Sequence, residues 1–239
     1  MRGTVSACIY LLLLNTAFLQ ADDEPKSRAQ VTNVDRADFP AGGVLRIDNS
    51  IGELTVVGWD RPEVEVATIK STKAVYGSQA REKAIQDLSK VRIKTERRGN
   101  EVVVRTDFPQ YAPFPPNPLR SGHGNFDIEY RISAPREARL VIDHNNGEVH
   151  IDDVLSDIRA NVLTGSITLR LPEENQYSID AKADAGGIFS EFPGQVHRRF
   201  SLIGFRMNTK PPQASHSLQL RIGFGDIAIV KIHKPPYGQ

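Results

Sequence analysis

Short segments in which apolar and polar residues alternate make up most of the chain. The stretch LRIDNSIGELTVVGWD, residues 45–60, alternates, breaks at a polar turn that ends in Gly52, and then alternates again. From residue 126 onward nearly every segment follows the same pattern. A period of two is typical of β-strands that bury one face. The pattern therefore predicts an all-β fold.

One segment, residues 77–90, has a helical pattern instead. Its Ala84, Ile85 and Leu88 form an apolar stripe at spacings of three and four. Ser78 has a side chain suited to cap the first turn. We therefore expect one short helix in the N-terminal part of the β domain.

The phrase around Gly52 returns several times later in the chain. Each copy places a glycine just before a polar or small residue and a β-branched residue or leucine; the glycines are Gly52, Gly147, Gly165, Gly187 and Gly225. A recurrence of about 20 residues is the signature of a solenoid, in which one repeat forms one turn of a coil. Each glycine would form the corner where one strand turns into the next. An antiparallel β-sandwich would explain the alternation equally well, but the recurrence favours a single-stranded β-solenoid or β-roll.

The N-terminus has the zones of an export signal. A basic residue precedes an apolar run that extends to Leu19, and Ala21 precedes an acidic stretch. This layout predicts a cleaved secretory signal over residues 1–21. The apolar run is shorter than the roughly 20 residues of a spanning helix, so we expect no stable membrane insertion after cleavage. Residues 22–38 are polar and unpatterned, which indicates a flexible leader before a β-solenoid domain over residues 39–236.

Charge and cysteine content narrow the class of partner. Cys8 is the only cysteine and lies in the predicted signal, so the mature chain forms no internal disulfide. The chain has 30 Lys and Arg and 29 Asp and Glu, and loss of Arg2 with the signal balances the two. A neutral exported chain is not a typical binder of nucleic acid or anionic membranes. We expect an envelope protein or a glycan as partner.

A proline-rich segment, residues 107–125, interrupts the β pattern. Its five prolines and two glycines exclude regular structure and predict a long surface loop. The aromatic residues Phe108, Tyr111 and Phe114 either hold this loop on the sheet or form a contact patch. Trp59, the only tryptophan, either covers the core or stacks on a sugar. These four residues are the predicted contact surface.

The order of several phrases is more informative than any one of them. LRIDNSIGELTVVGWD is followed by EVEVATIKS, AREKAIQDLSKVRI, EVVVRT, FDIEYRISAPREARLVIDHNNGEVHI and the later phrases TGSI and GFGDI. In this order the chain resembles the bacterial putative-adhesin family of DUF4097 type. The resemblance covers most of the mature chain and departs from the family pattern between residues 192 and 217. It implies an exported β-solenoid or β-roll.

Acidic residues and histidines cluster in one repeat, in a way that could suit a metal ion. These residues are His144, Glu148, His150, Asp152 and Asp153. The alternation puts Glu148, His150 and Asp152 on the solvent-facing side of one strand. A solvated strand face therefore explains the cluster better than a metal site does. We expect no metal and no cofactor.

A second group of acidic residues could line a solenoid. Asp48, Asp143 and Asp180 stand at similar places in their copies. They could form an acidic ladder, as a carbohydrate-active β-helix enzyme or a weak Ca²⁺ site would require. Aspartate also favours turns because it bonds nearby backbone amides, and we prefer this explanation.

No catalytic motif is present. The sequence contains no G-x-S-x-G, H-E-x-x-H or P-loop pattern. The basic cluster His197-Arg198-Arg199 is too short to indicate nucleic-acid binding. We therefore expect a secreted or periplasmic, non-enzymatic module for envelope-associated binding, adhesion or scaffolding. The alternative is a carbohydrate-active β-helix enzyme with acidic residues in a groove.

Overall fold

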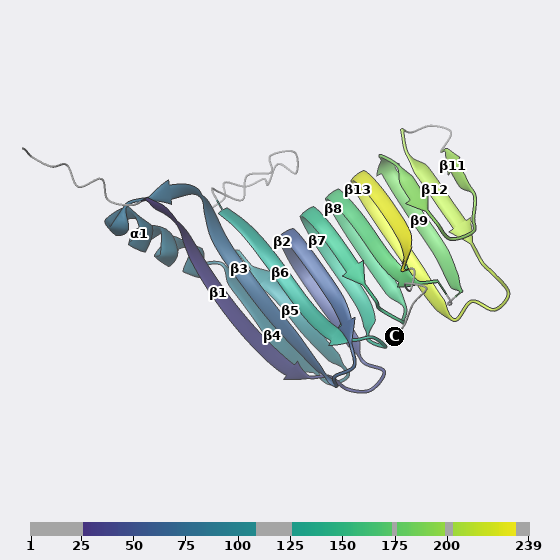
Figure 1. Ribbon diagram of the computed structural model, residues 1–239, viewed down its shortest axis with the longest axis horizontal. Coiled ribbons are helices and arrows are strands. Elements are labelled where there is room, and N and C mark those ends of the chain that lie inside the picture. Colours follow the sequence, from purple (N-terminus) through teal and green to yellow (C-terminus); the bar gives the residue numbers. More distant parts are fainter. Residues whose placement is uncertain (1–25, 109–125, 174–175, 199–202, 233–239) are drawn as a thin grey trace, which may run out of the picture.

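The computed structural model describes residues 26–108, 126–173, 176–198 and 203–232. Within these ranges the chain is all-β with one helix, and its strands form a mixed 13-stranded sheet that does not close. The strands lie side by side along the long axis of the molecule (Figure 1). The predicted signal peptide, Tyr111, Phe114 and most of the proline-rich loop fall outside the described residues.

The sheet combines very long strands with short ones at its edges. In chain order the elements are β1 Ser27–Asp38, β2 Val44–Trp59, β3 Glu63–Tyr76, α1 Ser78–Ser89, β4 Arg92–Arg98, β5 Glu101–Asp107, β6 Phe126–Pro135, β7 Arg139–Asp152, β8 Ile158–Pro172, β9 Tyr177–Ala185, β10 Ile188–Ser190, β11 Val196–Arg198, β12 Phe205–Thr209 and β13 His216–Ile232. The spatial order is β1-β3-β6-β2-β7-β8-β13-β9-β12-β11, with β5 joining β4 to β2 and β10 beside β13.

The long strands β2, β7, β8 and β13 each bend at a glycine. In β2 the residues before Gly52 pair with β5, and those after it pair with β6. The buried positions change phase at the same point: Leu45 and Ile47 are buried before the glycine, and Leu54 and Val56 after it. Each long strand therefore passes from a first section of the sheet to a second. Side chains of both sections pack into one continuous core.

The first section contains the strand parts before the glycines together with β4, β5, β9, β11 and β12. The second section contains the parts after the glycines together with β1, β3, β6 and β10. The sequence pattern predicted a turn between two strands at each glycine. The chain instead stays extended through the bend, so each predicted pair of strands is one long strand.

The bend glycines lie in register across the sheet. Gly52 pairs with Gly147, Gly147 with Gly165, and Gly165 with Gly225. Their φ angles are 90°, 125°, 136° and 131°, which L side chains rarely adopt. A Cβ atom on Gly165 would lie 1.7 Å from the carbonyl oxygen of Gly147. The close approach of neighbouring backbones thus requires glycine at this position.

The fifth glycine of this ladder is Gly186, and not Gly187 as the sequence pattern predicted. Gly186 has a φ of 136°, and a Cβ on it would lie 1.9 Å from the carbonyl oxygen of Gly225. Gly187 lies one residue past the bend, where its N–H donates to Asp226 Oδ1 at 2.6 Å. The two adjacent glycines look alike in sequence, but only the first stacks on the backbone of its neighbour.

The strands do not stack in chain order, as one coil per repeat would require. β13 lies between β8 and β9 and is parallel to both. The chain therefore leaves β9, passes through β10, β11 and β12 at the edge, and returns to insert β13. The interval between Gly186 and Gly225 holds this edge excursion.

Residues 27–38 form β1, whereas the sequence pattern assigned residues 22–38 to a flexible leader. β1 pairs antiparallel with β3 from Ser27 to Asp38, with one irregularity near Arg28. As an edge strand it is exposed on both faces along most of its length, so its sequence lacks the alternation of the inner strands. Asp35 of β1 accepts a hydrogen bond from Thr95 of β4 at 3.4 Å, which links the two sections at this end.

The helix α1 connects the two sections between β3 and β4. It spans Ser78–Ser89, close to the predicted range, but its N-cap is Gly77 rather than Ser78. Leu88 is its buried residue. Just beyond the helix, the carbonyl oxygen of Val91 accepts a hydrogen bond from the buried Lys70 Nζ at 2.9 Å. Among the described residues no helix is both long and apolar enough to cross a membrane.

Candidate functional site

Polar side chains form two rows on the outer side of the first section, across β8, β13, β9 and β12. The row nearer the bend contains Asn161, Arg221, Lys182 and Arg206, and the next row contains Arg159, Gln219, Asp180 and Asn208. We call these residues the polar grid. Neighbouring strands lie about 4.8 Å apart, so adjacent members can contact the same ligand. Asp180 is the acidic member, and the other charged members are cations.

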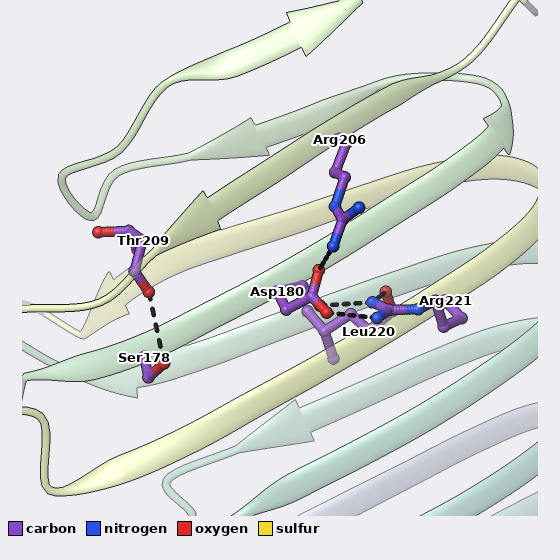
Figure 2. A network of polar contacts seen from close by, with 6 residues as sticks. All are labelled: Ser178, Asp180, Arg206, Thr209, Leu220 and Arg221. Carbon is purple, nitrogen blue, oxygen red and sulfur yellow. Dashed lines mark hydrogen bonds and ion pairs between the residues drawn. The ribbon is translucent and has the colours of Figure 1, made fainter. Parts of the chain in front are cut away.

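Asp180 holds two arginines of the grid in place. Its carboxylate accepts hydrogen bonds from Arg206 Nη2 at 3.3 Å and from Arg221 Nη2. Arg221 Nη1 also donates to the backbone oxygens of Asp180 at 2.7 Å and Leu220 at 2.9 Å. Figure 2 shows the carboxylate between the two guanidinium groups. Three neighbouring strands are thereby tied together through one carboxylate.

The charge of Asp180 is stable at neutral pH. Partial burial acts to raise the pKa of its carboxyl, but the hydrogen bond and charge of Arg221, assisted by Arg206, outweigh this effect. The pKa of Asp180 is therefore lower than usual. The carboxylate remains a fixed acceptor for both arginines.

Several donors of the grid still point to solvent. The Arg206 side chain is 53% exposed, and among the described residues only Asp180 contacts its guanidinium. Arg159 is exposed, and within the described part of the chain it forms no ion pair. Lys182 Nζ lies 2.8 Å from Asp184 Oδ1. Asn161 Nδ2 donates to Asp143 Oδ1 at 2.8 Å. The grid thus presents positioned cations and amides on an open surface.

The predicted acidic ladder is not one structure. Asp48 and Asp143 are paired positions on β2 and β7, but Asp180 lies two residues out of step with them. Asp143 is in line with Asn161, Arg221 and Lys182. All three aspartates lie within strands, so the turn explanation was also wrong. Their outward direction follows from the alternation alone.

The outer side of the second section carries a different row. Its members in register are Glu129, Glu53, Glu148, Ser166 and Asp226. We call these residues the acidic row. Three of its glutamates, together with Asp127, line a shallow cavity of about 410 Å³ beside Gly52. Glu129 forms an ion pair with Arg131, and Glu148 Oε2 lies 3.2 Å from His150 Nε2.

The predicted histidine and acid cluster is divided between the core and the surface. Glu148, His150 and Asp152 are on the outer side of β7, as the alternation predicted. His144 is buried, and its Nδ1 lies 2.8 Å from Ser50 Oγ. Burial lowers the pKa of His144 to about 4. No group of metal-binding side chains occurs within the described residues.

Trp59 and Phe108 do not form one patch. Trp59 ends β2 beside Pro135, and its Nε1 donates to the Glu63 backbone oxygen at 2.9 Å. The Arg61 guanidinium lies 4.9 Å from the centre of the Trp59 ring. Phe108 follows β5, which pairs with the opposite end of β2, and it packs partly against the core. A shared surface with Tyr111 and Phe114 remains a prediction.

A second cavity, of about 480 Å³, lies at the end of the sheet near β9. Tyr177 and Phe192 form one wall, with ring centres 5.2 Å apart in an edge-to-face arrangement. Lys231 Nζ lies 5.6 Å from the Phe192 ring centre and 2.9 Å from Glu173 Oε1. Lys231, the cationic side chain that lines this cavity, is therefore already paired with Glu173.

The polar grid was missed from the sequence, although a signal for it is present. Counting back four residues from each ladder glycine gives Asp48, Asp143, Asn161, Arg221 and Lys182. Counting forward one residue gives most of the acidic row. This alignment requires Gly186 in place of Gly187. Similar residues around each aspartate grouped Asp180 with Asp48 and Asp143, but Asp180 lies six residues before Gly186, whereas the other two lie four residues before Gly52 and Gly147.

The comparison with solved structures gives matches of low similarity. A putative cell adhesion protein from Clostridium sporogenes matches with 15% identity and a TM-score of 0.44, covering 84% of this chain and 100% of the other. A putative adhesin from Bacteroides fragilis matches with 10% identity and a TM-score of 0.32, covering 84% and 97%. A putative lipid binding protein from Parabacteroides distasonis has 7% identity and a TM-score of 0.20, covering 84% and 97%.

No protein-family model matches the sequence, and no curated protein matches it. The resemblance to the DUF4097-type family therefore remains a prediction from the order of the sequence phrases.

Proposed function

We propose that this protein is an exported, non-enzymatic binding module that holds an extended glycan of the cell envelope on the polar grid. The main supporting observation is the fixed arrangement of Arg206, Asp180 and Arg221 across three strands. Side chains that are already held in place lose little freedom when a ligand binds. A row of exposed side chains that crosses several strands suits a polymer better than a small molecule, because small ligands are usually enclosed by a cavity.

The glycine ladder supports this function by fixing the strand spacing. A glycan that lies across the strands contacts one position on each of β8, β13, β9 and β12. Amides such as Asn161 and Gln219 can both donate to and accept from sugar hydroxyls. The acidic member Asp180 accepts, and the cations donate. Export is supported by the three zones of the N-terminal sequence.

Binding of the full chain to a panel of neutral and acidic polysaccharides tests this function. The double variant Asn161→Ala, Gln219→Ala removes two amides of the grid, and we expect weaker binding. Thr168→Ala, on the outer side of the second section, is the matched control and should bind like the unmodified chain. Binding to no polysaccharide, or equal binding by both variants, would refute the function. Mass spectrometry of exported protein tests the signal, with Asp22 expected as the first residue.

The acidic cavity is the observation that favours a second candidate function, glycoside cleavage. Glu53 lies on the strand between Glu129 and Glu148, and glycosidases act with two nearby carboxyl groups. The partners Arg131 and His150 already engage the two outer glutamates. Release of reducing ends from the same polysaccharide panel, lost in Glu53→Gln, would establish the enzyme. Absence of release by the unmodified chain would exclude it for those substrates.

A further inference from the structure

The polar grid has a charge preference that extends the proposed function. Apart from Asp180, its charged members are Arg159, Arg206, Arg221 and Lys182. The one carboxylate is shared by two of these cations. The grid therefore carries a net positive charge even with its internal ion pairs formed. An anionic ligand would be attracted to it, and a neutral one would gain only hydrogen bonds.

The geometry of the arginines favours a particular anion. A guanidinium presents donors in a planar fork that matches a carboxylate. Asp180 takes one edge of the Arg206 fork through Nη2, and among the described residues the remaining donors of Arg206 have no partner. Arg159 lies at the other side of the grid with its fork open. Two guanidinium groups are thus available on strands separated by β13 and β9.

The amides beside these cations point to a ligand with hydroxyl groups. Gln219 lies beside Arg159, and Asn208 lies beside Asp180 in the same row. Amides bond hydroxyls through both their donor and their acceptor. None of the eight grid residues is aromatic, although Phe224 of β13 is exposed at the bend, and base stacking on a series of aromatics is the usual basis of single-stranded nucleic-acid binding. The arrangement fits sugars that carry carboxylates better than a nucleic acid.

We propose that the ligand of the polar grid is an acidic polysaccharide whose carboxylates bind Arg159 and Arg206 and whose hydroxyls bind the neighbouring amides of the grid. This inference rests on the proposed function and adds the class of glycan. The polymer runs across the strands, perpendicular to β8 and β13, because the cations and amides follow one another in that direction. Asp180 is a positioning residue, since it holds Arg206 and Arg221 and does not itself meet the carboxylates.

The test measures binding of the full chain to polygalacturonate, neutral dextran, dextran sulfate and duplex DNA on equivalent surfaces. We expect the tightest binding to polygalacturonate. The affinity for dextran should be lower by a factor of about ten or more. Affinity should fall as NaCl rises from about 0.05 to 0.5 M, because salt screens exposed charges. Tighter binding to dextran sulfate or DNA would overturn the carboxylate preference.

A pair of charge-matched variants tests the location. The double variant Arg159→Ala, Arg206→Ala should weaken polygalacturonate binding about tenfold or more. The control Arg131→Ala, Arg170→Ala removes the same charge from the outer side of the second section and should stay within about twofold. Equal losses in both variants would show that net charge alone attracts the polymer, and would overturn the proposal.

The outcomes also separate this inference from the proposed function. Equal binding of dextran and polygalacturonate, both lost in the Asn161→Ala, Gln219→Ala variant, would overturn the acidic ligand and retain a glycan-binding grid. Binding to none of the polysaccharides would overturn both. Circular dichroism and thermal unfolding of each variant verify that a loss of binding is not a loss of fold.

Discussion

The two outer faces of the sheet carry opposite charge, although the same long strands build both. In β8, Arg159 and Asn161 precede the bend and Ser166 follows it. In β13, Arg221 precedes the bend and Asp226 follows it. The core residues on either side are equally apolar. A strand that changes sheet section at a glycine can therefore change its surface chemistry without any change in its packing.

The faces also differ in how their charges are compensated. In the polar grid, Asp180 lies between two arginines. In the acidic row, Glu53 lies between Glu129 and Glu148. Like charges directly opposite one another on neighbouring strands are destabilising, and opposite charges are stabilising. The grid is thus held in place by its own contacts, whereas the acidic row contains unrelieved repulsion at its centre.

The largest expected effect comes from the ladder that joins the two faces. In Gly165→Val, the new side chain would begin 1.7 Å from the Gly147 carbonyl oxygen, at a φ of 136°. The strands must separate to admit it, so we expect the free energy of unfolding to fall by about 3–5 kcal/mol. Urea unfolding followed by circular dichroism measures this change.

Gly99 provides the control for that substitution. It also has a positive φ, 61°, but an added Cβ would meet nothing within 4 Å. Gly99→Ala should lower the free energy of unfolding only by the backbone strain, about 1 kcal/mol. A Gly165→Val loss no larger than this would mean that the ladder tolerates a side chain and that the two faces are not coupled through it.

Acid should weaken the same bend through His144. This buried side chain on β7 contacts Ser50 on β2, and burial lowers its pKa to about 4 from 6.5. Above pH 6.5 the histidine is neutral in both states, and its contribution to stability is complete. As the pH falls from 6.5 toward 4, only the unfolded chain takes up the proton, so about 3 kcal/mol is lost.

The variant His144→Gln should remove most of this pH dependence while keeping a polar partner for Ser50. The free energy of unfolding, measured between pH 7.5 and about 4.5, distinguishes the two chains. His150→Gln is the control, because His150 is on the outer side of the same strand. Parallel pH curves for the unmodified chain and His144→Gln would contradict a buried neutral histidine.

The sequence predicts the core of this fold better than its connections. Alternation locates the buried residues of β2, β7, β8 and β13, because each strand has one side on the core. It also predicts the outward direction of Glu148 and His150. It fails for β1, since an edge strand exposed on both faces needs no alternation.

The spatial order of the strands in the sheet could not be predicted from the sequence, for a physical reason. The copies around Gly165, Gly186 and Gly225 have similar residues, so any of them could pair with the others. Insertion of β13 between β8 and β9 depends on the edge strands that follow β9, and those have weak patterns. The grid therefore forms from residues far apart in the chain, such as Asp180 and Arg221.

A smaller effect is expected within the grid itself. Asp180→Asn removes the charge that holds Arg206 and Arg221, and at neutral pH we expect a loss of about 1 kcal/mol in unfolding free energy. The folded pKa of Asp180 is below its usual value. Its contribution is therefore present above the unfolded pKa and is lost as the pH falls through the folded pKa. The difference between the chains should shrink as the pH falls below the usual range of a carboxyl pKa; a constant difference would exclude a charge effect.

The smallest expected effect is a gain, and it lies on the opposite face. Glu53→Gln removes the central charge between Glu129 and Glu148, so stability should rise by a few tenths of a kcal/mol and the gain should fade in high salt. Glu65→Gln is the control, because Glu65 pairs with Arg36 and its loss should give no gain. If Glu53→Gln is instead destabilising, the central glutamate has a favourable partner, and the acidic row is as well compensated as the polar grid.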